Sequence, residues 1–439
     1  MNKPLFSIVI PTRNRAHLLR SSLHSALSQD FDDYEVVVIN NNCHDDTDLV
    51  VQSFKSEKLQ YFHTSQTLSM PDNWEFAWSK ARGKYVLYLC DDDALLPTTL
   101  SFITKHILPQ NPKVVTWNLI RYNHPNWVEN ENQQSRCFPL EDRNTLVIPI
   151  ENKVFEKFSS KILLEKLYKF EESIWFPRML NCCVEKQAID RIREKLGSIF
   201  IPICPDYSFM STVLHLCSEI YVVYKPLAIW GVSPSSIGAT QHRQGNHGKA
   251  AKEFSKEFGE YNFYEDCPVD IPIVPNYIAS TLLRRNKTLL DAGFEPQEID
   301  WSMYFVCMAS ALNHLQENIP CISDYRVTLI KAAYQYSLES GQVTENILET
   351  ENRPALITIL NYIGKFIQSS QLLCRLELAI RHKNNLNEYY RFLRLDKGIL
   401  GHRNLLIIQG DEIGASSITD MANVANLYFE KYKKVFNNT

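Results

Sequence analysis

Several features that would assign a chain to a specialised class of protein are missing from this sequence. No apolar run approaches the roughly 20 residues that a membrane-spanning helix needs. The formal net charge of −4 and the pI near 6.3 leave no overall basic field, which argues against nucleic acid as the main partner. The eleven cysteines include no Cys-x-x-Cys pair, so neither a disulfide framework nor a structural zinc site is indicated.

A secretory signal is also missing from the start of the sequence. Residues 1–4 lead directly into an apolar segment, without a charged n-region, a long h-region or a cleavage site. We therefore expect a protein of the reducing cytoplasm. The 439 residues are enough for two or three domains with a well-buried core.

The first hundred residues contain a regular alternation of apolar runs and helical patterns. This alternation is typical of a parallel sheet covered by helices. Strands are expected at 6–10, 35–39, 59–63, 85–90 and 114–122, and helices at 18–28, 45–54 and 72–82. Polar loops follow the first, second and fourth of these strands, and they meet at the edge where open parallel sheets bind ligands.

The rest of the chain is expected to become progressively helical. After a polar stretch that runs to about residue 144, the patterns predict helices at 153–170, 185–196 and 206–216, a strand at 219–224 and a loop over 226–240. Beyond residue 245, further helices are expected at 277–292, 296–317, 324–339, 354–381 and 420–436. The last of these carries aromatic residues and lysines, so it either docks through its aromatic stripe, which we favour, or lies on an anionic membrane surface.

Three consecutive carboxylates, Asp91, Asp92 and Asp93, follow the strand expected at 85–90. Three like charges in a row repel one another and do not fit into a core, so their position at the end of a buried strand indicates a bound cation. Oxygen ligands select the hard ions Mg²⁺ or Mn²⁺, which normally bring substrate phosphates with them. The alternative is a solvated turn that caps the next helix, with Pro97 near the first turn of that helix.

Three segments stand in a fixed order along the first half of the chain: Ile8–Arg15, Val36–Asn42 and Gly83–Asp93. Their order and spacing resemble those of the family 2 glycosyltransferases. The resemblance implies a GT-A fold of the α/β class, with a Rossmann-like, mostly parallel sheet and helices on both faces. The helical patterns beyond residue 245 predict a mainly helical C-terminal domain after it. It further implies transfer of a sugar, with inversion, from a nucleotide-diphosphate donor to an acceptor hydroxyl. Residues 1–245 would form the catalytic domain and residues 246–439 an accessory domain for acceptor binding or oligomerisation.

The resemblance also assigns the nucleotide-binding residues. The loop after the first strand would hold the nucleoside through Pro11, Thr12, Arg13 and Asn14. Alternatively, Asn14 and Arg15 simply cap and solvate the following helix. Asn40 and Asn41 stand where the family usually carries acidic residues that recognise the base or ribose. An amide still donates and accepts hydrogen bonds, so the base stays open between uridine, thymidine and guanosine, with a UDP-sugar favoured.

In the same comparison, the carboxylate triplet matches the metal motif of the family. Asp93 is the expected direct ligand of Mn²⁺ or Mg²⁺, Asp91 is a second ligand nearer the ribose, and Asp92 assists or orients the loop. The cation would bridge the donor diphosphate. Earlier in the chain, Asn73 would contact the nucleotide, whereas Asp72 is expected as an N-cap and Trp74 as a packing residue.

Asp206 matches the carboxylate that the family places at the start of a downstream helix, where it removes the acceptor proton. A helix N-terminus favours the ionised form that a base needs. The alternative role is a plain N-cap. Further on, His242 and Arg243 would reach the donor phosphates, or they are solvated linker residues.

The expected role is the assembly of a surface polysaccharide or glycoconjugate, with a glycan, a lipid-linked compound or another hydroxyl compound as acceptor. A lipid-linked acceptor would fit a protein peripheral at the inner face of the membrane, and a homodimer stays open. A sugar nucleotidyltransferase is disfavoured because its glycine-rich phosphate loop is missing: residues 11–15 contain no glycine. A non-catalytic scaffold that binds sugar nucleotides and works through its helical domain is the remaining alternative.

Overall fold

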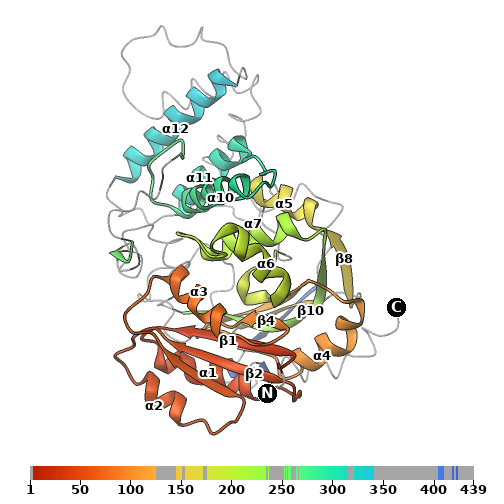
Figure 1. Ribbon diagram of the computed structural model, residues 1–439. Helices are drawn as coiled ribbons and strands as arrows, with labels where there is room; N and C mark the ends of the chain where they lie inside the picture. The colour runs from red at the N-terminus through yellow and green to blue at the C-terminus, as the bar shows by residue number, and fades with distance from the viewer. Residues whose placement is uncertain are drawn as a thin grey trace.

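The computed structural model describes most of the first two thirds of the chain. The described residues are 3–124, 145–150, 154–171, 176–233, 266–314, 321–340 and 404–409, with single positions at 236, 252, 254, 256–258, 264, 418, 419, 422 and 423. The strands form a mixed sheet with helices on both of its faces (Figure 1). This arrangement confirms the predicted α/β class.

The N-terminal part of the sheet is parallel and follows the prediction closely. Its strands are β1 (Phe6–Thr12), β2 (Tyr34–Asn40), β3 (Leu59–His63) and β4 (Tyr85–Tyr88), in the spatial order β4-β1-β2-β3. The connecting helices are α1 (Ala16–Leu27), α2 (Thr47–Gln52) and α3 (Met70–Lys80). Because side chains alternate along a strand, Ile8 and Ile10 pack with α1 on one face, while Val9 packs with α3 on the other.

The other part of the sheet is mixed. Here β9 (Cys182–Glu185) runs antiparallel between β4 and β6 (Val114–Asn123). The long strand β10 (Glu219–Val232) is parallel to β6 and antiparallel to β5 (Ala94–Leu95) and β8 (Phe155–Ser159). β7 (Thr145–Ile150) joins β6 to β11 (Asn404–Gln409). The helices of this part are α4 (Thr99–His106), α5 (Ser160–Tyr168), α6 (Lys186–Leu196) and α7 (Pro205–Leu216), with short 3-10 helices η1 (Leu108–Gln110) and η2 (Met179–Asn181).

Two predicted segments are corrected by this sheet. The helix expected at 153–170 begins only at Ser160, because the residues before it pair with β10 as β8. The loop expected over 226–240 is a strand as far as Val232. Pro226 lies where the register of β10 against β6 shifts, and such an irregularity tolerates proline because no regular ladder bond needs its missing N–H.

The predicted helical region is present beyond the sheet as α10 (Val274–Asp291), α11 (Trp301–His314) and α12 (Ile322–Glu339). These helices stack above α7, on the side of the sheet away from α1 (Figure 1). Their buried side chains join those of α7 and the sheet in one hydrophobic cluster. The boundary at residue 245 therefore stays a prediction, because the core runs across it. The helix expected at 354–381, and nearly all of the one at 420–436, lie outside the described residues.

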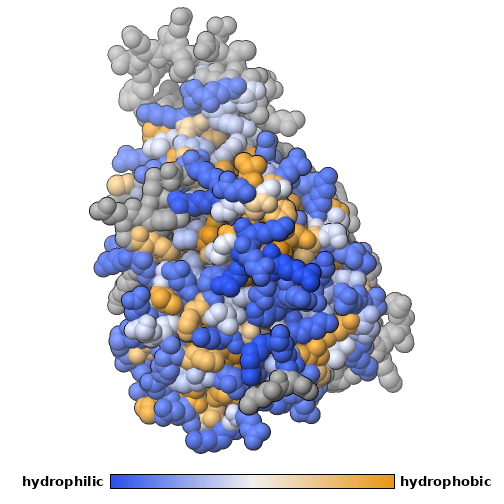
Figure 2. Space-filling view, in the orientation of Figure 1, coloured by the Kyte–Doolittle hydropathy of each residue, from blue (hydrophilic) through white to orange (hydrophobic). Residues whose placement is uncertain are grey.

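Among the described helices, none has both the length and the apolar character that crossing a membrane requires. The face of the molecule in Figure 2 is mostly hydrophilic, with small separate groups of hydrophobic residues between the polar ones.

Candidate active site

The carboxylate triplet lies in the short loop between β4 and β5, beside the end of β1. Asp91, Asp92 and Asp93 are only 4%, 7% and 2% exposed. The next helix, α4, has Thr98 as its N-cap. The alternative of a solvated turn that caps this helix is therefore wrong, and the three carboxyl groups are held inside the protein.

Asp91 is tied to the loop after β1. Thr12 Oγ1 donates to Asp91 Oδ2 at 2.8 Å, and Arg15 Nη1 donates to Asp91 Oδ1 at 3.0 Å. Burial raises the pKa of Asp91, and the Arg15 charge only partly opposes this effect. Burial alone would lower the pKa of Arg15, but Asp91 and Asp92 raise it above its ordinary value. Arg15 is thus the cation that balances part of the charge of the triplet.

Asp92 is held by the ends of two strands of the mixed part of the sheet. Ser233 Oγ and Ser236 Oγ donate to Asp92 Oδ2 at 3.1 and 2.7 Å. His124 Nε2 lies 2.8 Å from the carbonyl oxygen of Asp92 and donates to it, because a carbonyl only accepts. Burial lowers the pKa of His124, and the contact with the Asp92 carbonyl only partly opposes this effect. These contacts hold Asp92 in place, and its role in assisting the metal ligand or orienting the loop stays a prediction.

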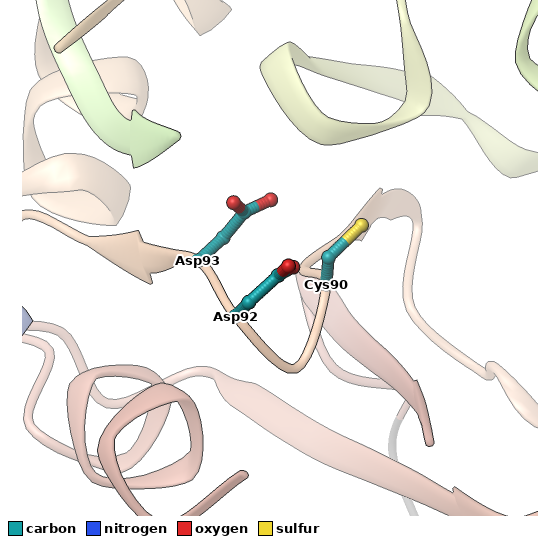
Figure 3. Close-up of side chains that lie close together, drawn as sticks. All are labelled: Cys90, Asp92 and Asp93. Atoms are coloured by element: carbon teal, nitrogen blue, oxygen red, sulfur yellow. The ribbon is translucent and has the colours of Figure 1, made fainter. Parts of the chain in front are cut away.

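Asp93 lies against β10. The Gly231 N–H donates to Asp93 Oδ1 at 2.8 Å. Burial, with Asp92 next in importance, raises the pKa of Asp93 well above its ordinary value, and burial and the three carboxylates do the same for Cys90. Figure 3 shows the side chains of Cys90, Asp92 and Asp93 pointing to the same side of the loop.

The ligand atoms of Cys90, Asp92 and Asp93 lie within 4.8 Å of one another. Two of the three groups offer hard oxygen ligands, and the cluster concentrates negative charge that a divalent cation would offset. These residues therefore fit a metal ion. This cluster includes the predicted ligand Asp93, but it contains Cys90 and Asp92 in place of Asp91. The role of Asp91 as a metal ligand therefore stays a prediction.

The predicted nucleoside loop, residues 11–14, joins the loop after β2. Asn14 adopts a positive φ of 54° and its Oδ1 accepts the N–H of His44 at 2.8 Å. Asn14 does not cap α1, since the first helical N–H, that of Ala16, is bonded by Asp45. Arg13 forms an ion pair with Glu257 and is 38% exposed. The Arg13 side chain thus stays partly accessible beside this loop.

Asn40 and Asn41 are buried and hold the loops around them. Asn40 Nδ2 donates to Tyr61 Oη at 2.8 Å and its Oδ1 accepts the Cys43 N–H at 2.7 Å. Asn41 Oδ1 accepts the Leu68 N–H at 2.8 Å, and its Nδ2 donates to the Leu68 carbonyl at 2.9 Å. Direct contact of these amides with a nucleotide stays a prediction.

Asn73 and Trp74 lie in the first turns of α3 and have different surroundings. Asn73 is buried, and its Oδ1 has no hydrogen-bond partner among the described residues. A buried amide oxygen without a partner is costly, which favours a ligand at this position. Trp74 packs against Tyr88, as expected. The N-cap of α3 is Ser69, which accepts the N–H of Asp72, so the prediction of Asp72 as N-cap is wrong.

Asp206 is the second residue of α7 and is half-buried. The N-cap of this helix is Cys204, so the plain N-cap alternative for Asp206 is wrong. In the first turn, the positive end of the helix dipole still favours an ionised carboxylate. His242 and Arg243 lie outside the described residues.

The comparison with known families gives a direct result for this part of the chain. Residues 7–168 match the model of glycosyl transferase family 2. The chain carries a family 2 glycosyltransferase domain. The matched residues include the loop after β1 and the carboxylate triplet, which are the two parts of the site that Thr12 and Asp91 join.

Curated relatives of the glycosyltransferase domain come from several bacteria. The GalNAc(5)-diNAcBac-PP-undecaprenol beta-1,3-glucosyltransferase of Campylobacter jejuni is 37% identical over 101 residues, which is 22% of this chain and 33% of that protein. The putative colanic acid biosynthesis glycosyl transferase WcaA of Escherichia coli is 27% identical over 107 residues, 24% of this chain and 38% of WcaA. The chain thus spans well under half the length of these relatives.

Similar solved structures cover more of the chain at low identity. TarS residues 1–349 of S. aureus, in complex with UDP-GlcNAc, is 16% identical, with a TM-score of 0.41, and the match covers 80% of this chain and 98% of TarS 1–349. The mannosyltransferase PcManGT of Pyrobaculum calidifontis, with GDP-Man and Mn²⁺, is 13% identical with a TM-score of 0.38, covering 88% and 89%.

Sequence patterns missed several residues that shape the site of the glycosyltransferase domain. They lie at the ends of β6 and β10 or in the first loop: Arg15, His124, Gly231, Ser233 and Ser236. Three of them fall in the segment that was expected to be a loop. A strand assignment for 226–232 would have placed them at the carboxyl edge of the sheet, beside the triplet.

Proposed function

We propose that the protein is a metal-dependent, inverting glycosyltransferase that moves a sugar from a nucleotide-diphosphate donor to an acceptor hydroxyl. The observation that carries the proposal is the buried carboxylate cluster at the end of β4, hydrogen-bonded through Asp91 to the loop after β1. A concentration of buried negative charge at the ligand-binding edge of a sheet is suited to a cation with its phosphates. The family match supports the same chemistry.

Asp93 is the proposed direct ligand of Mn²⁺ or Mg²⁺, and Asp91 or Asp92 is the proposed second protein ligand. When bound, the cation supplies positive charge that stabilises the leaving diphosphate. The remaining groups keep the carboxylates in place. Gly231 N–H holds Asp93, and the hydroxyls of Ser233 and Ser236 hold Asp92, so the site is formed before the donor arrives.

The donor is proposed to bind along the loops after β1 and β2. Thr12, Arg13 and Asn14, with Pro11 before them, would contact the nucleoside, and the half-exposed Arg13 guanidinium can pair with phosphate or stack on the base. Asn40 and Asn41 support this surface. Asn73 Oδ1, which has no partner among the described residues, would accept a hydrogen bond from a hydroxyl or amide of the donor. A UDP-sugar is our first choice. His242 and Arg243 remain proposed phosphate contacts.

Asp206 is proposed as the base that takes the acceptor proton while the hydroxyl oxygen attacks the anomeric carbon. The proton moves from the acceptor hydroxyl to a carboxylate oxygen of Asp206, and the nucleoside diphosphate leaves on the opposite face, which inverts the configuration. The position of Asp206 in the first turn of α7 favours the carboxylate form that this step needs.

We propose a glycan or lipid-linked acceptor of surface polysaccharide or glycoconjugate assembly. The supporting observation is the kind of relative found: one is named for a substrate attached to undecaprenol through a diphosphate, and another for colanic acid biosynthesis. Residues 1–245 would carry the catalysis and residues 246–439 would help bind the acceptor or form a dimer. A lipid-linked acceptor would bring the protein to the inner face of the membrane.

A thermal-shift panel tests the donor part of the proposal. UDP-, GDP- and dTDP-sugars are each added with and without Mn²⁺ or Mg²⁺, and a ligand at 100 times its Kd adds about 2.7 kcal/mol of stability. We expect a shift that needs both one nucleotide class and a metal ion. The absence of a thermal shift with every combination of nucleotide sugar and metal ion would contradict the proposal.

A transfer assay with Asp206→Asn tests the chemical step. The variant is expected to keep the metal-dependent shift and to lose transfer, measured as nucleotide release in the presence of acceptor. Unchanged transfer removes Asp206 as the base. Donor binding by the wild-type protein without transfer to any glycan or lipid-linked acceptor would favour the scaffold alternative.

A further inference from the structure

The segment that leads to Asp206 is held by a helix from the far end of the core. Residues 197–204 connect α6 to α7 and end two positions before Asp206. Thr281 Oγ1, on α10, accepts the N–H of Ile203 at 3.1 Å and that of Cys204 at 3.2 Å. The hydroxyl itself donates to Tyr277 O within α10. Thr281 is fully buried, so water does not replace these bonds when they are lost.

A second residue of α10 binds the beginning of the same segment. Arg285 lies one helical turn after Thr281, and its Nη2 donates to Ile199 O at 2.7 Å and its Nη1 to Ser198 O at 3.1 Å. The side chain is completely buried, and its Nε has no partner among the described residues. Burying a guanidinium is unfavourable unless its contacts are needed. Here the contacts fix two carbonyl groups of the segment.

The opposite side of the segment is held by α3. Glu75 accepts the N–H groups of Ile199 and Phe200 at 2.5 and 3.0 Å, and the hydroxyl of Ser198 at 2.8 Å. Its other carboxylate oxygen pairs with Arg193 of α6 at 2.7 Å. The segment is thus clamped between α3 and α10 by hydrogen bonds on both sides.

The clamped segment also touches the strand that carries the carboxylates. The Phe200 ring lies 5.8 Å from that of Tyr88, between centroids, and 5.5 Å from that of Trp74. Tyr88 is the last residue of β4, directly before the loop with Asp91–Asp93, and its Oη donates to Trp74 O at 2.7 Å. These contacts therefore connect the segment before Asp206 with β4, the strand that leads to the carboxylate triplet.

We propose that Thr281 and Arg285 are positioning residues for the transfer step, acting by fixing the segment that places Asp206 relative to the carboxylates of the β4–β5 loop. This inference rests on the proposed role of Asp206 as base. Displacing a reacting group by about 1 Å can lower the rate on the order of 100-fold. The gain in rate from a fixed backbone therefore outweighs the free-energy cost of burying an arginine. It follows that α10 would support the catalytic residues from outside the proposed catalytic domain, 1–245.

The test compares Thr281→Val with Thr281→Ser. Valine keeps the shape of threonine but accepts no hydrogen bond, whereas serine keeps the hydroxyl. We expect Thr281→Val to lower kcat by about 10-fold or more with the donor Kd unchanged, and Thr281→Ser to stay within about 2-fold of wild type. Ser337→Ala removes a buried hydroxyl that is bonded within α12, and it controls for general loss of stability.

A double-mutant cycle separates positioning from simple structural support. If Thr281 acts through Asp206, Thr281→Val should lower the residual rate of the Asp206→Asn variant by less than about 2-fold. Equal reductions in both backgrounds would overturn the inference. If Asp206→Asn alone leaves transfer unchanged, the proposed base fails first, and the two failures are thereby distinguished.

If Thr281→Val does not fold, Arg285→Lys provides an alternative variant for the same test. Lysine keeps the charge but lacks the fork that reaches two carbonyl groups. We expect the same pattern, with kcat reduced, the donor Kd kept and no further reduction in the Asp206→Asn background. A variant that loses donor binding and transfer in parallel would contradict positioning of Asp206.

Discussion

The backbone N–H of Gly231 donates to Asp93 Oδ1 at 2.8 Å, and a Cβ at this glycine would lie 1.7 Å from the carbonyl oxygen of Asp92. β10 therefore approaches the carboxylate loop as closely as a chain without a side chain allows. The contact with the end of β10 fixes the shape of the loop. The geometry of the proposed metal site therefore depends on a strand far away in the sequence.

Gly231→Ala should abolish metal-dependent donor binding, because the added methyl group pushes the loop away from β10. Gly197→Ala is the control: its Cβ would meet nothing within 4 Å, although its φ of +76° costs about 1 kcal/mol for alanine. Binding measured by calorimetry with Mn²⁺ should be lost in the first variant and kept in the second. Normal Mn²⁺-dependent binding by Gly231→Ala would refute the close approach.

Ser236→Ala should weaken Mn²⁺ affinity by about 10-fold, since the hydroxyl orients Asp92 beside the proposed ligand Asp93. The double variant with Ser233→Ala should lose more, because both hydroxyls share one carboxylate oxygen. Ser101→Ala is the matched control, since its hydroxyl donates to the Thr98 carbonyl at the start of α4 and not to the carboxylate loop. Equal affinities in all three variants would show that Asp92 needs no orientation.

Arg15→Gln should destabilise the protein by roughly 3 kcal/mol, because a mostly buried carboxylate loses its charged partner. Added Mn²⁺ should restore part of this loss, since the cation then offsets the charge of the triplet. Urea unfolding with and without Mn²⁺ gives both quantities. Arg20→Gln, on the exposed face of α1, should change neither. A variant of Arg15 as stable as wild type would remove its role in balancing the triplet.

Thiol reactivity should follow burial along the chain. Cys182 and Cys183 lie in β9 inside the sheet, and burial raises the pKa of both thiols well above the ordinary value. Cys321 is exposed. In the folded protein at pH 8, mass spectrometry should find Cys321 alkylated by N-ethylmaleimide and the β9 pair unmodified until denaturant is added. Rapid labelling of Cys182 and Cys183 in the native state would contradict their place in the sheet.

The parallel part of the sheet could be predicted from the sequence because its signals are local. Runs such as Val36–Ile39 are apolar on both faces and are bounded by polar loops, as a buried strand requires. The triplet could be assigned to the edge of the sheet by the same logic. What binds each carboxylate could not be predicted.

The contacts of the triplet come from distant segments with no local signal. Pro226 suggested a loop and concealed the second half of β10, which brings Gly231 and Ser233 to the carboxylates. Likewise, the helical pattern around Thr281 predicts a helix but not the segment that its hydroxyl binds, since that depends on how α10 packs on α7. Tertiary pairing decided these positions.

The most direct test of the central claim is calorimetric binding of a UDP-sugar in the presence and absence of Mn²⁺, for the wild-type protein and for Asp93→Asn. Asparagine keeps the shape of the side chain and can still accept the Gly231 N–H, but it carries no charge. The account predicts binding by the wild type that requires Mn²⁺, and loss of that metal-dependent binding in the variant. Metal-dependent binding of equal strength in both proteins would contradict a metal site at Asp93.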